Sequence, residues 1–286
     1  MATARARVGI DIGGTFTDLV LVDDATGAIS VSKILTTPHN PAIAVADGFA
    51  MATLTGGVTA DAVTRVVHGT TLVTNAVLEQ KGARTALITT AGFRDTLEIQ
   101  TENRYDMYDL GLEKPRSLVP RRLRAEVRER TYADGRVAQP LDAGDVRQVA
   151  ERFRAAGVEA VAVCFVNGYR NGDHERQAAD LLRALLPGVP VAISSDVSPE
   201  IREYHRSVTT VVNAYVMPLV GRYVEELQRR LRDNGFQGDV FLMLSNGGIC
   251  TVDTARRFPV RLIESGPAAG ALIAAHVGRE AGALDL

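Results

Sequence analysis

A cluster of polar residues surrounds a Gly-Gly pair near the N-terminus. Asp11 ends an apolar, β-prone run, and the pair Gly13 and Gly14 follows it. Thr15 and Thr17 then lead into a second apolar run. Two such runs around a Gly pair predict a β-hairpin. Glycines without Cβ atoms let an anion approach the backbone N–H groups, and the threonines add hydroxyl donors. Asp11 is suited to hold Mg²⁺ beside a phosphate. An ordinary Gly-Gly hairpin is the alternative.

A second candidate motif is His68-Gly69-Thr70-Thr71, which follows a predicted strand and opens a predicted helix. Backbone N–H groups at such a helix start favour an anion or a developing oxyanion. His68 is a candidate acid or base near neutral pH. Asp11, His68 and Thr70 are therefore the catalytic candidates. The alternative is a capping loop with a structural histidine.

Two Gly-rich motifs lie near the C-terminal end. The first, Ser245-Asn246-Gly247-Gly248, follows a predicted strand, where α/β sheets commonly place ligands. The second is Glu264-Ser265-Gly266-Pro267-Ala268, in which Ser265 suits the N-cap of a helix and Gly266 permits close approach. A simple turn and close helix packing are the respective alternatives.

The sequence leaves one further binding residue open and excludes several common catalytic motifs. The segment Glu102–Asp106 contains Arg104, which can present a guanidinium to a substrate carboxylate, although a solvated charged loop explains it equally well. No Gly-Lys dipeptide occurs, so there is no P-loop, and no Gly-x-Ser-x-Gly elbow is present. His174-Glu175 lacks a second histidine at helical spacing and is not a zinc motif. A serine nucleophile of the α/β-hydrolase type is therefore not expected in this chain.

Composition narrows the class of protein. The 286 residues are 46% hydrophobic with a net charge of −2, which excludes a disordered chain and a basic nucleic-acid-binding surface. No apolar run approaches the roughly 20 residues that span a membrane. The N-terminus has no long apolar segment typical of a signal peptide. Two distant cysteines imply no disulfide framework, which fits a cytoplasmic location.

Alternating elements predict an α/β fold. Residues 7–35 are expected to form a strand, a hairpin and another strand, and residues 100–140 an excursion. Expected helices cover 41–54, 71–81 (ended by Gly82), 142–156, 173–186, 199–234 with a break near Pro218, and a last helix from Ser265. Expected strands cover 65–68, 84–90, 125–132, 158–166, 189–194 and 239–244.

The turn at residues 8–23 resembles the first phosphate-binding loop of the actin/hexokinase/Hsp70 superfamily of ATPases. Residues 66–95 resemble the hydantoinase A/5-oxoprolinase family. Further matches are Arg202-Glu203-Tyr204, Val212-Asn213-Ala214-Tyr215-Val216, Ser245-Asn246-Gly247-Gly248 and Glu264-Ser265-Gly266-Pro267-Ala268. The resemblance implies an α/β, actin-like (ribonuclease H-like) N-terminal domain at 1–195, with a β-hairpin phosphate loop. The start of a second domain is expected at 196–286.

The resemblance also implies an activity, namely ATP-dependent hydrolysis of 5-oxoproline or a hydantoin through phosphorylation of the lactam carbonyl. ATP and Mg²⁺ are the implied cofactors, with Asp11 holding the metal. The implied nucleotide-binding residues are Gly13, Gly14, Thr15, Thr17, Ser245, Asn246, Gly247, Gly248, Ser265 and Gly266. A subunit of an ATP-dependent ketone carboxylase and a non-catalytic nucleotide-binding module are the alternatives. A hydantoinase B-like partner is expected, and nucleic acid and membrane partners are not. A homo-oligomer is left open.

In the family, a second Gly-Gly-Thr phosphate loop follows the Ser-Gly-Pro-Ala helix. This sequence ends at Leu286, before such a loop. The chain is therefore expected to be the N-terminal portion of a longer enzyme.

Overall fold

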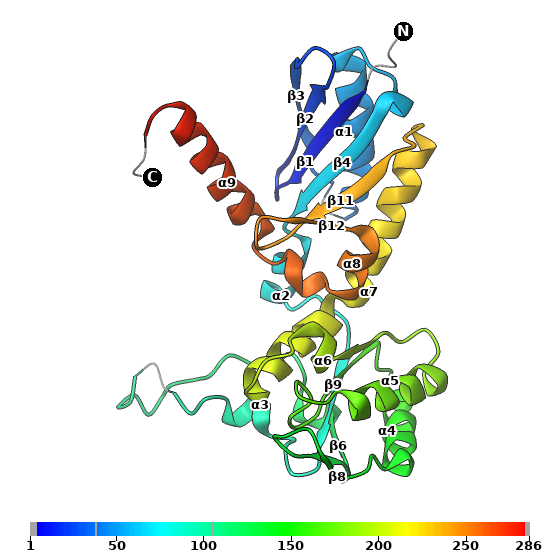
Figure 1. Ribbon diagram of the computed structural model, residues 1–286, viewed down its shortest axis with the longest axis vertical. Helices are drawn as coiled ribbons and strands as arrows, with labels where there is room; N and C mark the ends of the chain where they lie inside the picture. Colours follow the sequence, from blue (N-terminus) through cyan, green and yellow to red (C-terminus); the bar gives the residue numbers. More distant parts are fainter. Residues whose placement is uncertain (1–4, 38, 104–105, 284–286) are drawn as a thin grey trace. The chain divides into compact units, whose positions relative to one another are not determined.

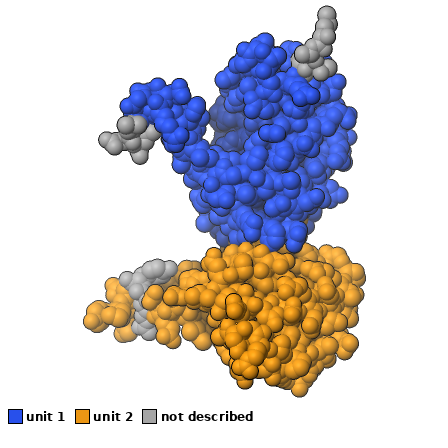
Figure 2. Space-filling model, viewed as in Figure 1, with its two compact units in different colours: residues 1–79, 219–286 blue, residues 80–218 orange. Residues whose placement is uncertain are grey.

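The structure is a computed structural model that describes residues 5–37, 39–103 and 106–283. The chain divides into two compact units (Figure 2). Unit 1 combines residues 1–79 with 219–286, and unit 2 comprises residues 80–218. Because unit 2 lies between the two segments of unit 1 in the sequence, the chain leaves unit 1 and later returns to it. Each unit is described by itself.

Unit 1 is built on a six-stranded mixed sheet with the order β12-β11-β4-β1-β2-β3 (Figure 1). The strands are β1 (Ala6–Ile12), β2 (Phe16–Asp23), β3 (Ile29–Leu35), β4 (Val63–Thr70), β11 (Asp239–Met243) and β12 (Ile249–Thr251). The first three strands form an antiparallel meander. Strands β4 and β11 run parallel to β1, so that three strands end at the same edge of the sheet.

Helices cover one face of this sheet. The helices of unit 1 are α1 (Pro41–Gly56), α2 (Leu72–Leu78), the C-terminal part of α7 (Glu203–Asp233), α8 (Val252–Arg257) and α9 (Ser265–Glu280). The ring of Phe49 in α1 meets that of Phe236 edge-on at 5.5 Å, and Asn234 donates to the carbonyl of Ala46 at 2.8 Å. Alternate residues of β1 are buried, which is the period expected for a strand with one covered face. Asp11 lies on the other face.

Unit 2 contains a parallel four-stranded sheet with the order β10-β9-β5-β6. Its strands are β5 (Thr85–Thr90), β6 (Arg124–Val127), β9 (Ala160–Cys164) and β10 (Val191–Ile193), beside a hairpin of β7 (Arg130–Thr131) and β8 (Val137–Gln139). Its helices are α3 (Thr96–Ile99), α4 (Ala143–Ala155), α5 (Asp173–Leu185), α6 (Ser194–Val197) and the first part of α7. Every residue of β5 and β9 is buried, as expected for central parallel strands. Short 3₁₀ helices occur at Ala60–Ala62, Arg121–Leu123 and Pro259–Leu262.

Most expected elements are present. Pro41 opens α1 and Gly57 ends it in a left-handed conformation. Asp142 caps α4 by accepting hydrogen bonds from the backbone N–H groups of Gly144 and Asp145, at 2.8 and 3.1 Å. The mixed α/β fold with parallel strands therefore agrees with the prediction from the sequence.

Several boundaries differ from the expectation. The single strand expected at 125–132 is divided into β6 and β7, and the strand expected at 189–194 ends at Ile193, where α6 follows. Helix α7 begins at Glu203 rather than near Pro199, and it continues through Pro218 without a break. Helix α2 ends at Leu78, so Gly82 does not terminate it. A Cβ atom on Gly82 would collide with the ring of Tyr215. This glycine is needed for close packing, which a local helix-end rule does not detect.

No helix within the described parts of the chain is both long enough and apolar enough to cross a membrane.

A pair of glycines in unit 1 tests the packing of β11 beside β4. A Cβ at Gly238 would run into the backbone of Thr64, whereas a Cβ at Gly221, inside α7, would have no atom within 4 Å. We expect Gly238→Ala to lower the free energy of unfolding by about 1–3 kcal/mol. Gly221→Ala should raise it by about 0.5–1 kcal/mol, since alanine favours a helix over glycine. Denaturant unfolding of both variants measures this, and equal effects would contradict the packing described.

Candidate functional site

The motifs expected to bind nucleotide lie at one edge of the unit 1 sheet (Figure 1). The β1–β2 turn follows the end of β1, Thr70 ends β4 and Thr71 follows it, and the segment Ser245–Gly248 follows β11. Because β1, β4 and β11 are parallel neighbours, their C-terminal ends meet at this edge. In α/β sheets this is where ligands commonly bind.

The β1–β2 turn is held closed by its own backbone. The N–H of Gly13 donates to the carbonyl of Phe16 at 2.9 Å, and the N–H of Thr36 donates to the carbonyl of Thr15 at 2.9 Å. Neither Gly13 nor Gly14 has a left-handed backbone. A Cβ at Gly14 would meet no atom within 4 Å, so this residue leaves open space above the turn. The backbone conformation of this turn therefore does not require glycine. What the glycines provide is room for an anion.

Thr17 has a different position from Thr15. Thr15 is exposed, whereas Thr17 is fully buried. The Thr17 hydroxyl lies 3.0 Å from that of Thr36, which in turn donates to the carbonyl of Gly13 at 2.9 Å. With its own proton committed to Gly13, Thr36 accepts from Thr17. The Thr17 hydroxyl therefore supports the turn from inside and does not face a ligand.

Asp11 sits between two residues of neighbouring strands. In the register of the sheet, Asp11 lies opposite Asp18 on β2 and opposite Gly69 on β4. A Cβ on Gly69 would lie 3.0 Å from the Asp11 Oδ1, so the glycine makes room for the carboxylate. Partial desolvation, and then the charge of Asp18, raise the pKa of the Asp11 carboxyl above its usual value. Asp18 also forms an ion pair with Lys33 at 2.7 Å.

The side chains around Asp11 suit Mg²⁺ that is shared with a phosphate better than a metal ion that is enclosed by protein ligands alone. The described residues contain no group of three or more His, Cys, Asp or Glu side chains that could enclose an ion. Mg²⁺ commonly binds through one or two carboxylates and the phosphates of its substrate. A single carboxylate with a raised pKa, beside an open Gly-Gly turn, fits that pattern, because a cation would offset the charge repulsion on Asp11.

His68 lies on the covered face of the sheet. Its side chain is fully buried, and its Nε2 lies 2.6 Å from the hydroxyl of Tyr223 on α7. Burial raises the pKa of that hydroxyl, so Tyr223 donates the proton and His68 accepts it. The His68 Nδ1 then faces the carbonyl of Ile10 at 3.4 Å. Burial lowers the pKa of His68 to about 4. This environment gives no support to the acid–base role expected for His68.

Thr70 and Ser265 join the end of β4 to the start of α9. The Ser265 hydroxyl donates to the carbonyl of Thr70 at 3.3 Å, and both residues are buried. The Thr70 hydroxyl accepts from the N–H of Leu72 at 3.1 Å and so supports the entry into α2. Glu264, at a left-handed φ of 60°, takes the N-cap position that was expected for Ser265. Gly266 follows in the first turn of α9.

The segment Ser245–Gly248 forms the tight connection between β11 and β12. The N–H of Gly248 donates to the Asn246 Oδ1 at 2.9 Å, and Gly247 has a left-handed φ of 83°. The N–H of Ser245 donates to the carbonyl of Arg261 at 2.8 Å. A Cβ on Gly247 would lie 2.8 Å from Leu272 of α9. These four residues therefore lie beside α9, at the same edge as the other motifs.

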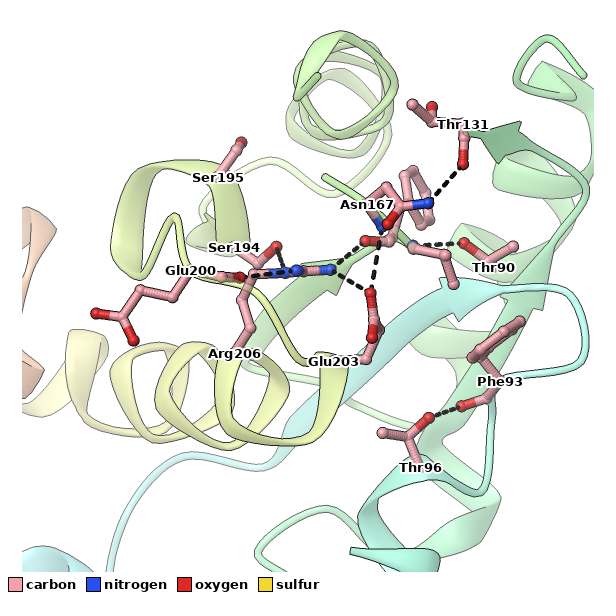
Figure 3. Close-up of polar contacts among 12 residues, drawn as sticks. Thr90, Phe93, Thr96, Thr131, Asn167, Ser194, Ser195, Glu200, Glu203 and Arg206 are labelled. Atoms are coloured by element: carbon pink, nitrogen blue, oxygen red, sulfur yellow. Dashed lines mark hydrogen bonds and ion pairs between the residues drawn. The ribbon is translucent and has the colours of Figure 1, made fainter. Parts of the chain in front are cut away.

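Unit 2 contains a second polar assembly, around the buried Arg206 (Figure 3). Its Nε donates to the Ser194 hydroxyl at 2.9 Å and its Nη1 to the carbonyl of Glu200 at 3.0 Å. Its Nη2 donates to the carbonyl of Phe165 at 2.5 Å and lies 3.5 Å from Glu203. This network fixes the beginning of α7. Sequence reasoning did not single out Arg206, since an isolated arginine in a helix gives no signal of burial.

The start of α7 forms one wall of a cavity of about 410 Å³. Its lining includes Phe93, Thr96, Gln100, Arg202 and Glu203. Arg104, the guanidinium expected to meet a substrate carboxylate, lies outside the described residues.

Comparison with known proteins places these features in a family. Residues 7–186 match the hydantoinase/oxoprolinase N-terminal region, and residues 206–286 match the hydantoinase/oxoprolinase domain. The chain belongs to the hydantoinase/oxoprolinase family.

Relatives with different named activities share this similarity. The chain is 38% identical to the caprolactamase subunit alpha of Pseudomonas jessenii, over 94% of the chain and 39% of that subunit. It is 29% identical to the 5-oxoprolinase of Dictyostelium discoideum, over 92% of the chain and 23% of that protein. A nucleotide-free structure of acetone carboxylase aligns with a TM-score of 0.87 and 26% identity, over 98% of the chain and 41% of that structure. The chain thus spans well under half the length of these relatives.

The buried His68 generates a pH-dependence that can be measured. The folded state takes up a proton on His68 only near pH 4, whereas the unfolded state does so near the ordinary pKa of 6.5. The stabilisation is therefore complete above pH 6.5 and is lost as the pH falls towards 4. The free energy of unfolding should drop by about 3 kcal/mol over this range from His68 alone.

Denaturant unfolding of the native protein and of His68→Gln, at several pH values between 4 and 8, isolates this contribution. The difference between the two proteins should shrink with falling pH, because the glutamine does not titrate. An unchanged difference across the whole range would show that the histidine is not held neutral.

Proposed function

We propose that this chain supplies the phosphate-binding part of an ATP-dependent enzyme that hydrolyses a cyclic amide. The observation that carries the proposal is the meeting of the Gly13–Gly14 turn, Asp11, the end of β4 and the start of α9 at one sheet edge. Relatives named 5-oxoprolinase and ATP-dependent caprolactamase support the reaction class. The ring size and substituents of the substrate are left open.

Each part of the edge has a proposed role. The open space at Gly14 and the exposed Thr15 would receive phosphate oxygens. Asp11 would hold Mg²⁺, and the bound ion would neutralise phosphate charge. The free N–H groups in the first turn of α9, at Ser265 and Gly266, would favour an anion.

Other residues keep this edge in place. Thr17 supports the turn, while His68 and Thr70 hold the end of β4. The connection at Ser245–Gly248 would border the nucleotide.

ATP would activate the amide bond for hydrolysis. Transfer of the terminal phosphoryl group of ATP to the lactam carbonyl oxygen would release ADP and activate the carbonyl carbon for attack by water. Cleavage of the ring C–N bond and release of inorganic phosphate would complete the hydrolysis. For the phosphoryl transfer the chain's own residues would orient the phosphates and hold the charge that develops on them, rather than provide a nucleophile.

The same arrangement supports an actin-like fold for unit 1. An antiparallel meander β1–β2–β3 is followed by parallel strands β4 and β11, in the order β3-β2-β1-β4-β11. We propose that the β1–β2 turn is the first phosphate loop of this ATPase architecture. The division into domains at 1–195 and 196–286 stays a prediction. The compact units divide the chain differently, into 1–79 with 219–286 and 80–218.

A ketone carboxylase subunit is the second candidate, because acetone carboxylase has a closely similar structure. In both cases a hydantoinase B-like partner is proposed, in line with relatives that are named as subunits. ATP turnover by the complete assembly containing this chain separates the two. Dependence on 5-oxoproline, a hydantoin or a lactam supports hydrolysis, and dependence on a ketone with bicarbonate supports carboxylation. Turnover with neither would favour a non-catalytic nucleotide-binding role.

We predict that Asp11→Asn in that assembly lowers substrate-dependent ATP turnover by on the order of 10³-fold, since it removes several kcal/mol of transition-state stabilisation. The amide has nearly the same size as the carboxylate, so the fold should persist. Steady-state release of ADP at saturating Mg²⁺ measures the effect.

The matched control is Asp18→Asn, the same change on the adjacent strand. Asp18 is paired with Lys33, so its loss should reduce turnover much less than the loss of Asp11. Near-normal turnover of Asp11→Asn, or an equal loss in both variants, would refute the assignment of Asp11.

A further inference from the structure

A second cavity of unit 2, of about 570 Å³, is lined by an unusual number of cationic side chains. Lys114, Arg116, Arg121 and Arg124 line it, together with the single carboxylate of Glu98. The chain as a whole carries a net charge of −2, so this concentration of positive charge is local. All residues that line the cavity belong to unit 2, whereas the residues of the proposed phosphate-binding edge belong to unit 1.

Arg124 is the buried centre of this cationic cluster. Its side chain is 1% exposed, its Nε donates to the carbonyl of Val119 at 2.9 Å, and its Nη2 pairs with Glu98 at 2.7 Å. Its Nη1 is buried and has no hydrogen-bond partner among the residues that the structure describes. An unpaired buried donor of a charged group is costly, and Arg124 is one of the residues that line the cavity.

The remaining cations are not equally available. Arg121 is engaged by Asp95 through two hydrogen bonds of 2.8 Å. Lys114 and Arg116 are exposed, and within the described parts of the chain neither forms an ion pair. The cavity therefore combines one incompletely satisfied buried guanidinium with two free cations at its rim.

Part of the cavity wall is apolar. Leu97 and Leu118 contribute to it, as do the α7 residues Val208, Val211 and Val212. A fully hydrated inorganic anion would leave this wall without a partner, whereas a neutral apolar molecule would leave the cations without one. The combination favours a ligand with an acceptor at one end and hydrocarbon at the other.

We propose that this cavity binds a small organic carboxylate with an apolar body. The carboxylate would lie among Arg124, Lys114 and Arg116, since guanidinium and ammonium groups form charge-assisted hydrogen bonds with carboxylates. The apolar body would lie against the valines of α7. None of the residues that line this cavity is a candidate for binding phosphate or Mg²⁺.

Calorimetric titration of the chain with three probes tests the proposal. Hexanoate carries both features, hexanamide has the same size without the charge, and inorganic phosphate has the charge without the hydrocarbon. Hexanoate should bind at least roughly tenfold more tightly than either of the other two, and its affinity should weaken with added salt.

Variants locate the binding. The double change Lys114→Glu with Arg116→Glu should weaken hexanoate binding roughly tenfold or more and leave the melting temperature unchanged, because both residues are exposed. Arg122→Glu is the matched control, since Arg122 is an exposed neighbour that does not line the cavity. Arg124→Lys should also weaken hexanoate binding while leaving hexanamide unaffected, provided that its melting curve shows a folded protein.

Several outcomes would overturn the proposal. Equal affinity for hexanoate and hexanamide would mark a purely apolar cavity, and equal or tighter binding of phosphate would mark an inorganic anion site. Lack of hexanoate binding at millimolar concentration would also exclude it. So would an equal loss of affinity in Arg122→Glu and the double variant, which would reveal only a general effect of charge.

Discussion

The parallel pairing of β1 with β4 and of β4 with β11 is the constraint on which the candidate site depends. Residues from three distant parts of the sequence reach one edge only because these strands share their direction and register. The same register places Gly69 beside Asp11, so the carboxylate has space that a Cβ at position 69 would crowd. A site of this kind is specified by strand pairing more than by any local motif.

The covered face of the sheet holds that register in place. His68 and Tyr223 satisfy each other inside the core, and Phe49 and Phe236 link α1 to the end of α7. A buried histidine that stays neutral acts as a packed polar residue with two fixed hydrogen bonds. The residue that looks most reactive in the motif at 68–71 therefore stabilises β4, and the exposed face carries the residues free to meet a ligand.

Local patterns in the sequence predicted most elements but not their relations in space. The N-terminal strand–hairpin–strand segment, the helix after Asp142 and the alternation of strands and helices were predicted from periodicity and turn residues. The burial of Thr17 was not, because it depends on Thr36, which pairing of β2 with β3 brings near. Nor was the continuity of α7 through Pro218, since tertiary packing overrides the local preference. The spacing of charges in residues 97–124 also did not predict a cationic cavity between this segment and α7.

The two buried arginines of unit 2 show how a polar core differs from a binding site. Arg206 is fully buried and each of its three nitrogens has an acceptor within the fold, so its network is complete without a ligand. Arg124 is buried to the same degree, yet Nη1 lacks an acceptor among the described residues and the side chain lines a cavity. Both arginines lose their hydration on burial, and Arg124 compensates for this only through Val119 and Glu98, with one nitrogen left over. The incomplete network is therefore the one for which a bound anion has a physical reason.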